Sequence, residues 1–330
     1  MNLERVDQIA RAVLYEGYML YPYRPSSVKN QQRWNFGVLY PRAYSEAQGG
    51  TDACSMRTEC LISGTVRTVL DVRLRFLQLQ LRSTQRPDEA TENGWQEAVE
   101  RDVSVPGFSL ETALFGPVTH VFQLPAQTLS ENDSSAAGLT SGSIVRRQSE
   151  VCGELVITCQ RIREDLLKVR VDVSNTTMSG TPDARRDDAL LHSLVSAHIV
   201  LSVTNGELIS LLEPPAELQE LTAQCQNIGA WPVLVGEPGQ RDTLLASPII
   251  LYDYPQIAPE SAGDLFDGTE IDEILSLRIM TLTDDEKQEI RQSDERARQI
   301  LERTETMPAE QFMKLHGAVR GLRPVKESTP

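Results

Sequence analysis

The fold class of this chain is decided by residues 70–81, which read LDVRLRFLQLQL. Apolar residues occupy every second position from Leu70 to Phe76, and charged residues stand between them. This period of two predicts a half-buried β-strand with a charged outer face. At Leu77 the alternation shifts by one residue and then continues to Leu81. Such a shift indicates a β-bulge, or a strand that passes from one sheet to another.

Two further pairs of segments predict antiparallel hairpins. Residues 151–162 and 166–174 are separated by a short charged turn around Glu164-Asp165. Residues 194–204 and 207–212 flank Asn205-Gly206, a strong hairpin signal because both turn positions need positive φ. Antiparallel connections without helical patterns between them predict a sandwich-like β core.

Helical patterns flank this core. Residues 3–16 repeat apolar side chains at spacings of three and four, which predicts an amphipathic helix. A short helix is expected over 214–227, and a capping box at Thr283-Asp284-Asp285-Glu286 predicts a helix in the C-terminal part. The predicted fold is therefore α+β: an N-terminal segment 1–50 packed on the core, a mainly antiparallel β domain 51–254 and a helical C-terminal region 255–330. Three polar stretches are expected to be surface loops: 83–94, 126–143 and 175–188.

Composition and charge exclude several classes of protein. The 330 residues are 40% hydrophobic and 24% charged, so the chain can form a packed core. A net charge of −15 argues against nucleic-acid binding, because neutralisation of phosphates supplies most of that affinity. No apolar run approaches the ~20 residues that span a bilayer, and residues 1–11 lack the apolar core of a signal peptide. We expect a cytoplasmic protein that inserts into no membrane.

The N-terminal segment differs from the rest of the chain. Six basic and four acidic residues give segment 1–50 a net charge of +2, and it is rich in Tyr and Trp. Tyr, Trp and Arg together are typical of protein-interaction hot spots, although packing on the chain's own core explains the same composition. The candidate partner-binding residues are Tyr21, Tyr23, Arg24, Lys29, Arg33, Trp34, Tyr40 and Arg42.

The five cysteines form no familiar pattern. An odd number and the absence of CxxC argue against a disulfide framework and against a structural zinc site. Cys152 and Cys159 point to opposite faces of a regular strand, unless a bulge near Gly153 brings them together. Buried, inert thiols are the expected state of most of them. His120, in the predicted strand 118–124, shares a face with Val118 and Phe122 and is expected to be half-buried.

Motifs of catalysis are absent from the sequence, including GxSxG, GxGxxG and HExxH. We therefore assign no catalytic residue, no cofactor and no metal site, and we predict a protein that is not an enzyme. The alternative is a metal-handling protein or a cysteine-dependent enzyme. Its candidate residues are Cys54, Cys60, His120, Cys152 and Cys159.

Two long stretches carry a family resemblance. They are YEGYMLYPYRPSSVKNQQRWNFGVLYPRAYSE, residues 15–46, and WPVLVGEPGQRDTLLASPIILYDYPQIAPESAGDLFDGTEIDEILSLRIMTLTDDEK, residues 231–287. Together they resemble an uncharacterised bacterial family encoded beside high-affinity nickel–iron hydrogenases, over most of the chain but less in the polar loops. That family has no assigned catalytic residues. The resemblance implies an accessory protein that assists hydrogenase assembly or maturation, with a hydrogenase subunit or maturation factor as its protein partner.

Overall fold

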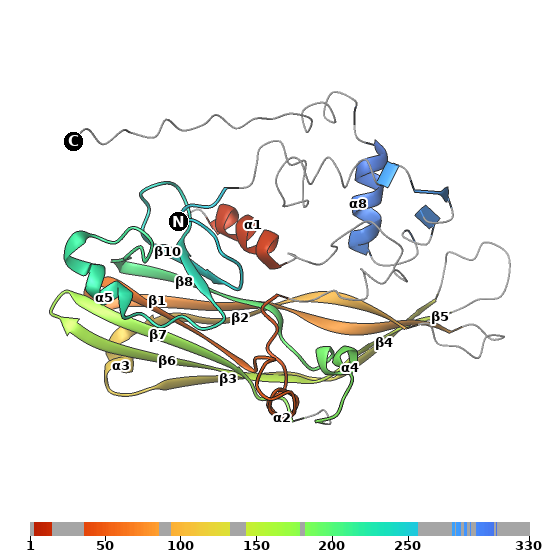
Figure 1. The fold of residues 1–330 in the computed structure, drawn as a ribbon, viewed down its shortest axis with the longest axis horizontal. Helices are drawn as coiled ribbons and strands as arrows, with labels where there is room; N and C mark the ends of the chain where they lie inside the picture. The colour runs from red at the N-terminus through yellow and green to blue at the C-terminus, as the bar shows by residue number, and fades with distance from the viewer. Residues whose placement is uncertain are drawn as a thin grey trace. The chain divides into compact units, whose positions relative to one another are not determined.

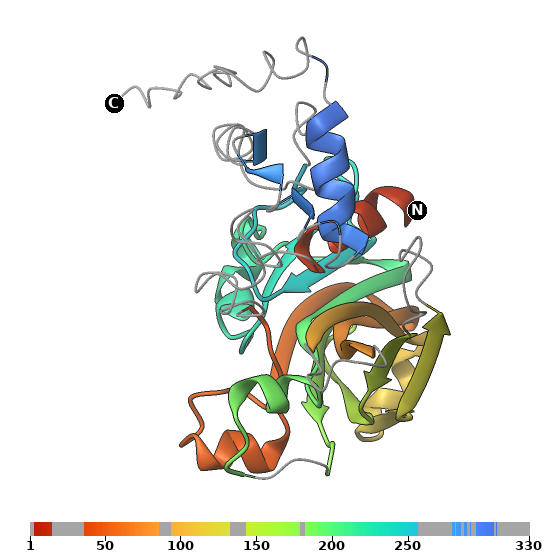
Figure 2. The ribbon, with the colours of Figure 1, turned by 90° about the vertical axis from the view of Figure 1, so that its right-hand side faces the viewer.

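The computed structural model describes part of the chain: residues 3–14, 36–85, 94–132, 143–178, 182–256, 279–280, 282–284, 287–288, 291, 295–306 and 308. The chain divides into two compact units. Met1–Tyr18 and Trp34–Pro255 form the first, and Met19–Arg33 and Gln256–Pro330 form the second. The first unit contains every described strand, and Figures 1 and 2 show it from two directions.

The first unit is built on one ten-stranded antiparallel sheet. Seven strands follow the order β3-β6-β7-β1-β8-β10-β9, while β2 pairs with β1, and β5 pairs with both β1 and β4. The strands are β1 Ser55–Gln85, β2 Trp95–Ser109, β3 Val118–Leu124, β4 Gln127–Asn132, β5 Ser143–Gln148, β6 Val151–Arg163, β7 Leu166–Asn175, β8 Val195–Leu208, β9 Trp231–Leu234 and β10 Thr243–Ser247.

The described helices are short. They are α1 Leu3–Leu14, α2 Arg42–Ala47, α3 Leu110–Leu114, α4 Arg186–Leu190, the 3-10 helix η2 Ala216–Leu218, α5 Gln219–Ala223 and α8 Glu295–Thr306. The predicted N-terminal helix is confirmed as α1, whereas the helix expected over 214–227 is divided into η2 and α5. In the C-terminal region 255–330, α8 is helical and most of the other residues lie outside the described part of the chain. No helix in the described ranges has the length and apolar character to cross a bilayer.

The sheet folds into two layers that face each other, and strand β1 belongs to both. Its residues 55–63 pair with β7. Its residues 69–82 pair with β2, and residues 80–85 pair with β5. Strand β8 runs along β1 from Ile62 to Leu77. Figure 1 shows the layer of β1, β2 and β8 above the layer of β7, β6 and β3.

A large irregularity in the pairing with β8 separates the two parts of β1. Residues 65–68 of β1 lie opposite a single residue of β8, Asn205. The side chain of Thr68 is fully buried there. Its hydroxyl donates to the Asn205 carbonyl oxygen over 2.8 Å and accepts the Thr65 amide over 3.1 Å. One threonine therefore satisfies two backbone groups that the bulge removes from the ladder of hydrogen bonds.

The predicted hairpin at Asn205-Gly206 is wrong. Strand β8 continues through both residues to Leu208. Asn205 has a φ of 60°, but Gly206 has no positive φ. A type I′ turn needs both positions left-handed, so Asn205 serves the bulge and does not reverse the chain. The other predicted hairpin is confirmed, because β6 and β7 pair around the turn at Glu164-Asp165.

One hydrophobic core lies between the two layers. Phe76 of β1 and Phe122 of β3 meet across it, with ring centroids 6.0 Å apart. The upper layer also contributes Leu70, Val72 and Leu74, and β6 and β7 contribute residues from the lower layer. The prediction of a mainly antiparallel β core is confirmed. The sandwich consists of one continuous sheet that faces itself, because β1 continues from one layer to the other.

The shift of alternation at Leu77 marks a real irregularity, but the extra residue lies in the neighbouring strand. Arg75 pairs with His198 and Leu77 with Val195, so β8 has one residue more than β1 at this point. Ser196 in that bulge has a φ of 53°. Along β2, the register of β1 is unbroken through the same position.

The expectation of surface loops is wrong in part of each of the three stretches. Residues 83–85, at the start of the stretch 83–94, belong to β1 and pair with β5. Residues 127–132, inside the polar stretch 126–143, form strand β4 and pair with β5. Asn175, the first residue of another predicted loop, ends β7 and is fully buried. Its amide donates to the carbonyl oxygens of Leu39 and His192, over 2.8 Å and 2.9 Å. These polar residues are ordered by partners that are distant in sequence.

Replacing Thr68 with valine tests the bulge. The valine keeps the shape of threonine but leaves the Thr65 amide and the Asn205 carbonyl without their buried partner. We expect the free energy of unfolding to fall by about 1–3 kcal/mol in urea titrations monitored by circular dichroism. Thr128→Val, at an exposed position of β4, is the control and should change stability by less than about 0.5 kcal/mol. Equal effects of the two substitutions would contradict this role of Thr68.

Candidate functional site

The predicted partner-binding residues are only partly described. Tyr21, Tyr23, Arg24, Lys29, Arg33 and Trp34 lie outside the described residues, so their role stays a prediction. Arg42 is exposed at the start of α2. Tyr40 is only 4% exposed and packs against Tyr44, with ring centroids 5.0 Å apart. Burial raises the pKa of both hydroxyls. Tyr40 therefore packs on its own chain.

The cysteines are all free thiols. Burial raises the pKa of Cys60 far above its usual range and raises the pKa of Cys159 and Cys225 to about 11. Cys152 and Cys159 lie on opposite faces of β6, as their spacing predicts, because its pairing with β7 is unbroken from Gly153 to Arg161. A thiol with a raised pKa stays protonated at neutral pH and is a poor nucleophile.

The histidine and metal predictions can be compared with the same part of the chain. His120 is half-buried on β3, on the face of the buried Phe122, as expected. Within the described ranges, no group of three or more His, Cys, Asp or Glu side chains is arranged to hold a metal ion.

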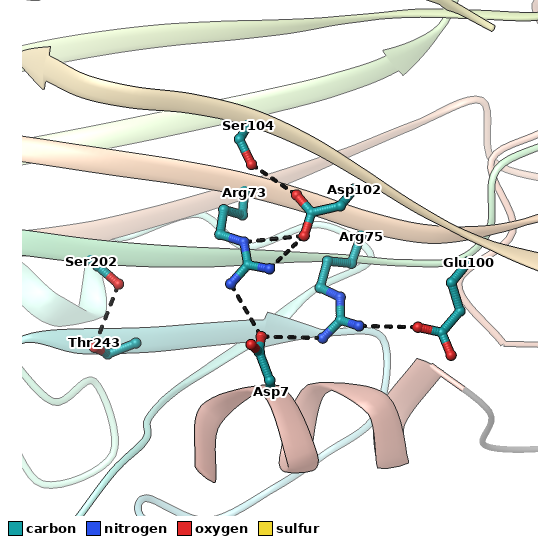
Figure 3. A network of polar contacts seen from close by, with 8 residues as sticks. All are labelled: Asp7, Arg73, Arg75, Glu100, Asp102, Ser104, Ser202 and Thr243. Atoms are coloured by element: carbon teal, nitrogen blue, oxygen red, sulfur yellow. Dashed lines mark hydrogen bonds and ion pairs between the residues drawn. The ribbon is translucent and has the colours of Figure 1, made fainter. Parts of the chain in front are cut away.

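Among the described residues, an ionic network joins α1 to the outer face of the sheet (Figure 3). We call it the α1 seam, and its members are Asp7, Arg73, Arg75, Glu100 and Asp102. Asp7 Oδ1 lies 3.1 Å from Arg73 Nη1 and 3.5 Å from Arg75 Nη1. Arg73 also binds Asp102, and Arg75 Nη2 lies 3.4 Å from Glu100 Oε2. One carboxylate of the helix thus bridges two arginines of β1, each of which is paired with an acid of β2.

Apolar contacts complete the attachment of α1. The helix buries Val6, Ile9, Ala10 and Val13 on one face, as its periodicity predicts. They form a cluster with residues of β8, β9 and β10 and with the residue after β9: Val200, Val233, Val235 and Leu245. Since the charges of the seam are paired with one another, its chemistry fastens the helix and offers no reactive group.

A buried histidine lies next to the seam. His198 is fully buried on β8, directly opposite Arg75 of β1. The Ser196 carbonyl oxygen, 2.9 Å from Nδ1, accepts the proton of that nitrogen, and Nε2 has no hydrogen-bond partner among the described residues. Burial, with help from the charges of Arg75 and Arg73, lowers the pKa of His198 to about 4. The ring is therefore neutral at physiological pH, since a second cation beside Arg75 is disfavoured.

The pKa of Asp102, another member of the seam, is shifted as well. Burial alone would raise the pKa of its carboxyl group, but hydrogen bonds from Arg73 and Ser104 and the charges of Arg73 and Arg75 outweigh it. The net result is a lowered pKa. Its ionised form is thereby stabilised by the arginines that also hold Asp7.

A second feature is a segment that we call the strap, residues 248–254, which follows β10. The Trp231 indole donates to the Leu251 carbonyl oxygen over 2.9 Å. Asp253 Oδ1 accepts the Leu234 amide over 2.7 Å, and the Tyr254 amide donates to the Leu234 carbonyl oxygen over 2.7 Å. These bonds fix the strap along the outer edge of β9, and Pro232 of that strand has no amide hydrogen to offer.

The strap holds two large apolar side chains in solvent. Ile250 is 75% exposed and Tyr252 is 84% exposed. The alternate residues, Ile249 and Leu251, pack against the cluster beneath α1. Sequence reasoning missed this feature, because the run from Ile249 to Tyr252 is apolar at every position and shows no sign of which side chains face outward.

Comparison with known proteins assigns this chain to no family. No family model matches the chain, and no curated protein matches it. The functional assignment therefore depends on the described side chains and on the resemblance of the two sequence stretches.

The buried His198 predicts a specific loss of stability in acid. The unfolded chain takes up the proton near pH 6.5, whereas the folded ring takes it up only near pH 4, so stability falls as the pH drops through this window. Across the whole window, the free energy of unfolding falls by about 3 kcal/mol because of this one group. His198→Leu should remove this pH-dependent component, even if its stability at pH 7.5 is lower. Urea unfolding at pH 7.5, 6, 5 and 4 measures it, and equal slopes in the two proteins would contradict the assignment.

Proposed function

We propose that this protein is a non-catalytic accessory protein that docks to a protein partner through the strap. The observation that carries the proposal is the exposure of Ile250 and Tyr252 on a backbone held by hydrogen bonds. Side chains on an ordered backbone lose less conformational entropy on binding than those on a free loop. Tyrosine is also enriched among the residues that dominate binding energy.

The chemistry of the thiols supports docking over the alternative of a cysteine-dependent enzyme. Catalytic cysteines have lowered pKa values in electropositive, accessible surroundings. Here burial raises the pKa of Cys60, Cys159 and Cys225. Burial is also the largest cause of the raised pKa of Cys152.

The partner that we propose is a hydrogenase subunit or a hydrogenase maturation factor in the cytoplasm. This part of the proposal rests on the resemblance, and the strap lies inside the second stretch that carries it, residues 231–287. The exposed Arg42 and the aromatic-basic residues of segment 15–35 remain proposed contributors to the same docking function.

Native co-purification from the host cell tests the docking. The tagged wild-type chain should retain its partner through washing. The double variant Ile250→Ala and Tyr252→Ala should retain at least tenfold less, since each hot-spot residue is worth more than about 1 kcal/mol. The matched control is Met178→Ala with Phe115→Ala, which removes two similarly exposed apolar side chains elsewhere. It should bind like the wild type.

Two results would count against this function. Recovery of the wild-type chain alone would contradict docking itself. Equal partner recovery by the strap variant and the wild type would place the binding surface elsewhere. Identification of the retained protein by mass spectrometry tests the hydrogenase part separately.

A further inference from the structure

The sheet has four edge strands in the described part of the chain, and three of them are protected. These strands are β2, β3, β4 and β9, each with one described neighbour. Proteins protect such edges with charges, prolines or covering segments, because unpaired backbone groups invite pairing with another chain. Strand β2 contains acidic and basic residues and Pro106, and β4 contains Glu131. Strand β9 contains Pro232 and is covered by the strap.

Strand β3 has none of these protections. Its sequence, VTHVFQL, contains no charged residue and no proline. Thr119, Val121 and Gln123 are exposed on its outer face, Val121 by 67%. Figure 1 shows β3 at the border of the sheet, and no other described residue forms a backbone hydrogen bond with its outer edge.

Two prolines limit the part of β3 that can pair with another strand. Pro117 and Pro125 bracket the strand, so an antiparallel self-paired ladder that fills the window between them is centred on Val121. We propose that two copies of this chain pair edge to edge through β3, antiparallel, about a two-fold axis at Val121. The two sheets then form one continuous sheet.

Three of the four kinds of cross-strand pair in this register are complementary, and the fourth places His120 opposite the partner's Phe122. Val121 meets its own copy, and Val118 meets the partner's Leu124, so apolar residues face apolar residues. Thr119 lies opposite the partner's Gln123. The amide nitrogen of Gln123 donates to Glu150 over 2.8 Å, and its oxygen can accept the hydroxyl of the partner's Thr119.

Electrostatics permit this contact despite the net charge of −15 on each copy. Glu154 lies opposite Val121 on β6, one strand inside the edge. In the dimer, the two Glu154 positions are three strand spacings apart, or about 14 Å. That exceeds the Debye length of about 8 Å at physiological salt, so their repulsion is largely screened.

The composition of β3 favours a second copy over an unrelated peptide. Self-pairing places Val121 against Val121 and Val118 against the partner's Leu124, and it brings no charged residue into the paired window. This proposal is independent of the docking function of the strap, which lies beyond the opposite edge of the sheet.

Light scattering after size exclusion tests the dimer with the full-length chain. A contact of one seven-residue strand belongs to the class of small, weak interfaces, so the experiment needs loading up to hundreds of micromolar. The wild-type mass should rise from 36.8 kDa toward twice that value as concentration increases. Val121→Lys puts two ammonium groups at the axis and should weaken association at least tenfold. The control Ile250→Lys changes an apolar side chain of similar exposure and should associate like the wild type.

Cross-linking tests the register even if Val121→Lys folds poorly. In the proposed dimer, two copies of Val121→Cys lie directly opposite each other, at a separation suited to a disulfide. Under mild oxidation this variant should form a dimer reducible by dithiothreitol at least tenfold faster than Ile250→Cys or the wild-type chain. A wild-type chain that stays monomeric at all concentrations would overturn the proposal. So would a dimer that Val121→Lys leaves intact and Val121→Cys fails to cross-link.

Discussion

The architecture depends on one strand that has to serve two layers. Strand β1 pairs with β7 in its first part and with β2 and β5 in its second, so every layer of the sheet is attached to it. A strand that changes layers must bend, and a bend breaks the regular ladder of backbone hydrogen bonds. The buried Thr68 satisfies two of the groups involved. Because these groups are paired, the irregularity leaves few buried polar atoms without a hydrogen bond, and the two layers can pack against each other around one core.

The outer face of the sheet carries charged residues that the core cannot hold. Arg73 and Arg75 alternate with the core residues of β1 and so must leave on the outer face. There α1 covers them, and the carboxylate of Asp7 pairs with both arginines and so stabilises the packing of the helix on the sheet. His198 stays neutral under the same cover, since burial and Arg75 both disfavour its charged form. Ile249 and Leu251 of the strap pack on the same cluster as α1, so the helix supports the presentation of Tyr252.

Much of the fold could be predicted because periodicity is a local property. The alternation over 70–81, the β6–β7 hairpin and helix α1 are all confirmed. The errors have one cause. Asn205-Gly206 has the residues of a hairpin turn, yet β8 passes straight through, because the chain beside it contains a bulge that uses the left-handed Asn205. Polar residues 127–132 form a strand because β5 offers them a partner. Tyr40 has the chemistry of an interface residue but is buried by its own chain.

The sequence by itself determined that this protein is an acidic, mainly antiparallel β protein with an N-terminal amphipathic helix, since alternation, helical spacing and charge depend only on neighbouring residues. The tertiary structure decided which of the many similar apolar residues remain outside. Ile249 and Leu251 are covered while Ile250 and Tyr252 are exposed, and β3 is left at an edge while equally apolar strands are enclosed. Exposure is set by contacts between residues far apart in the chain, and a local pattern holds no record of those contacts.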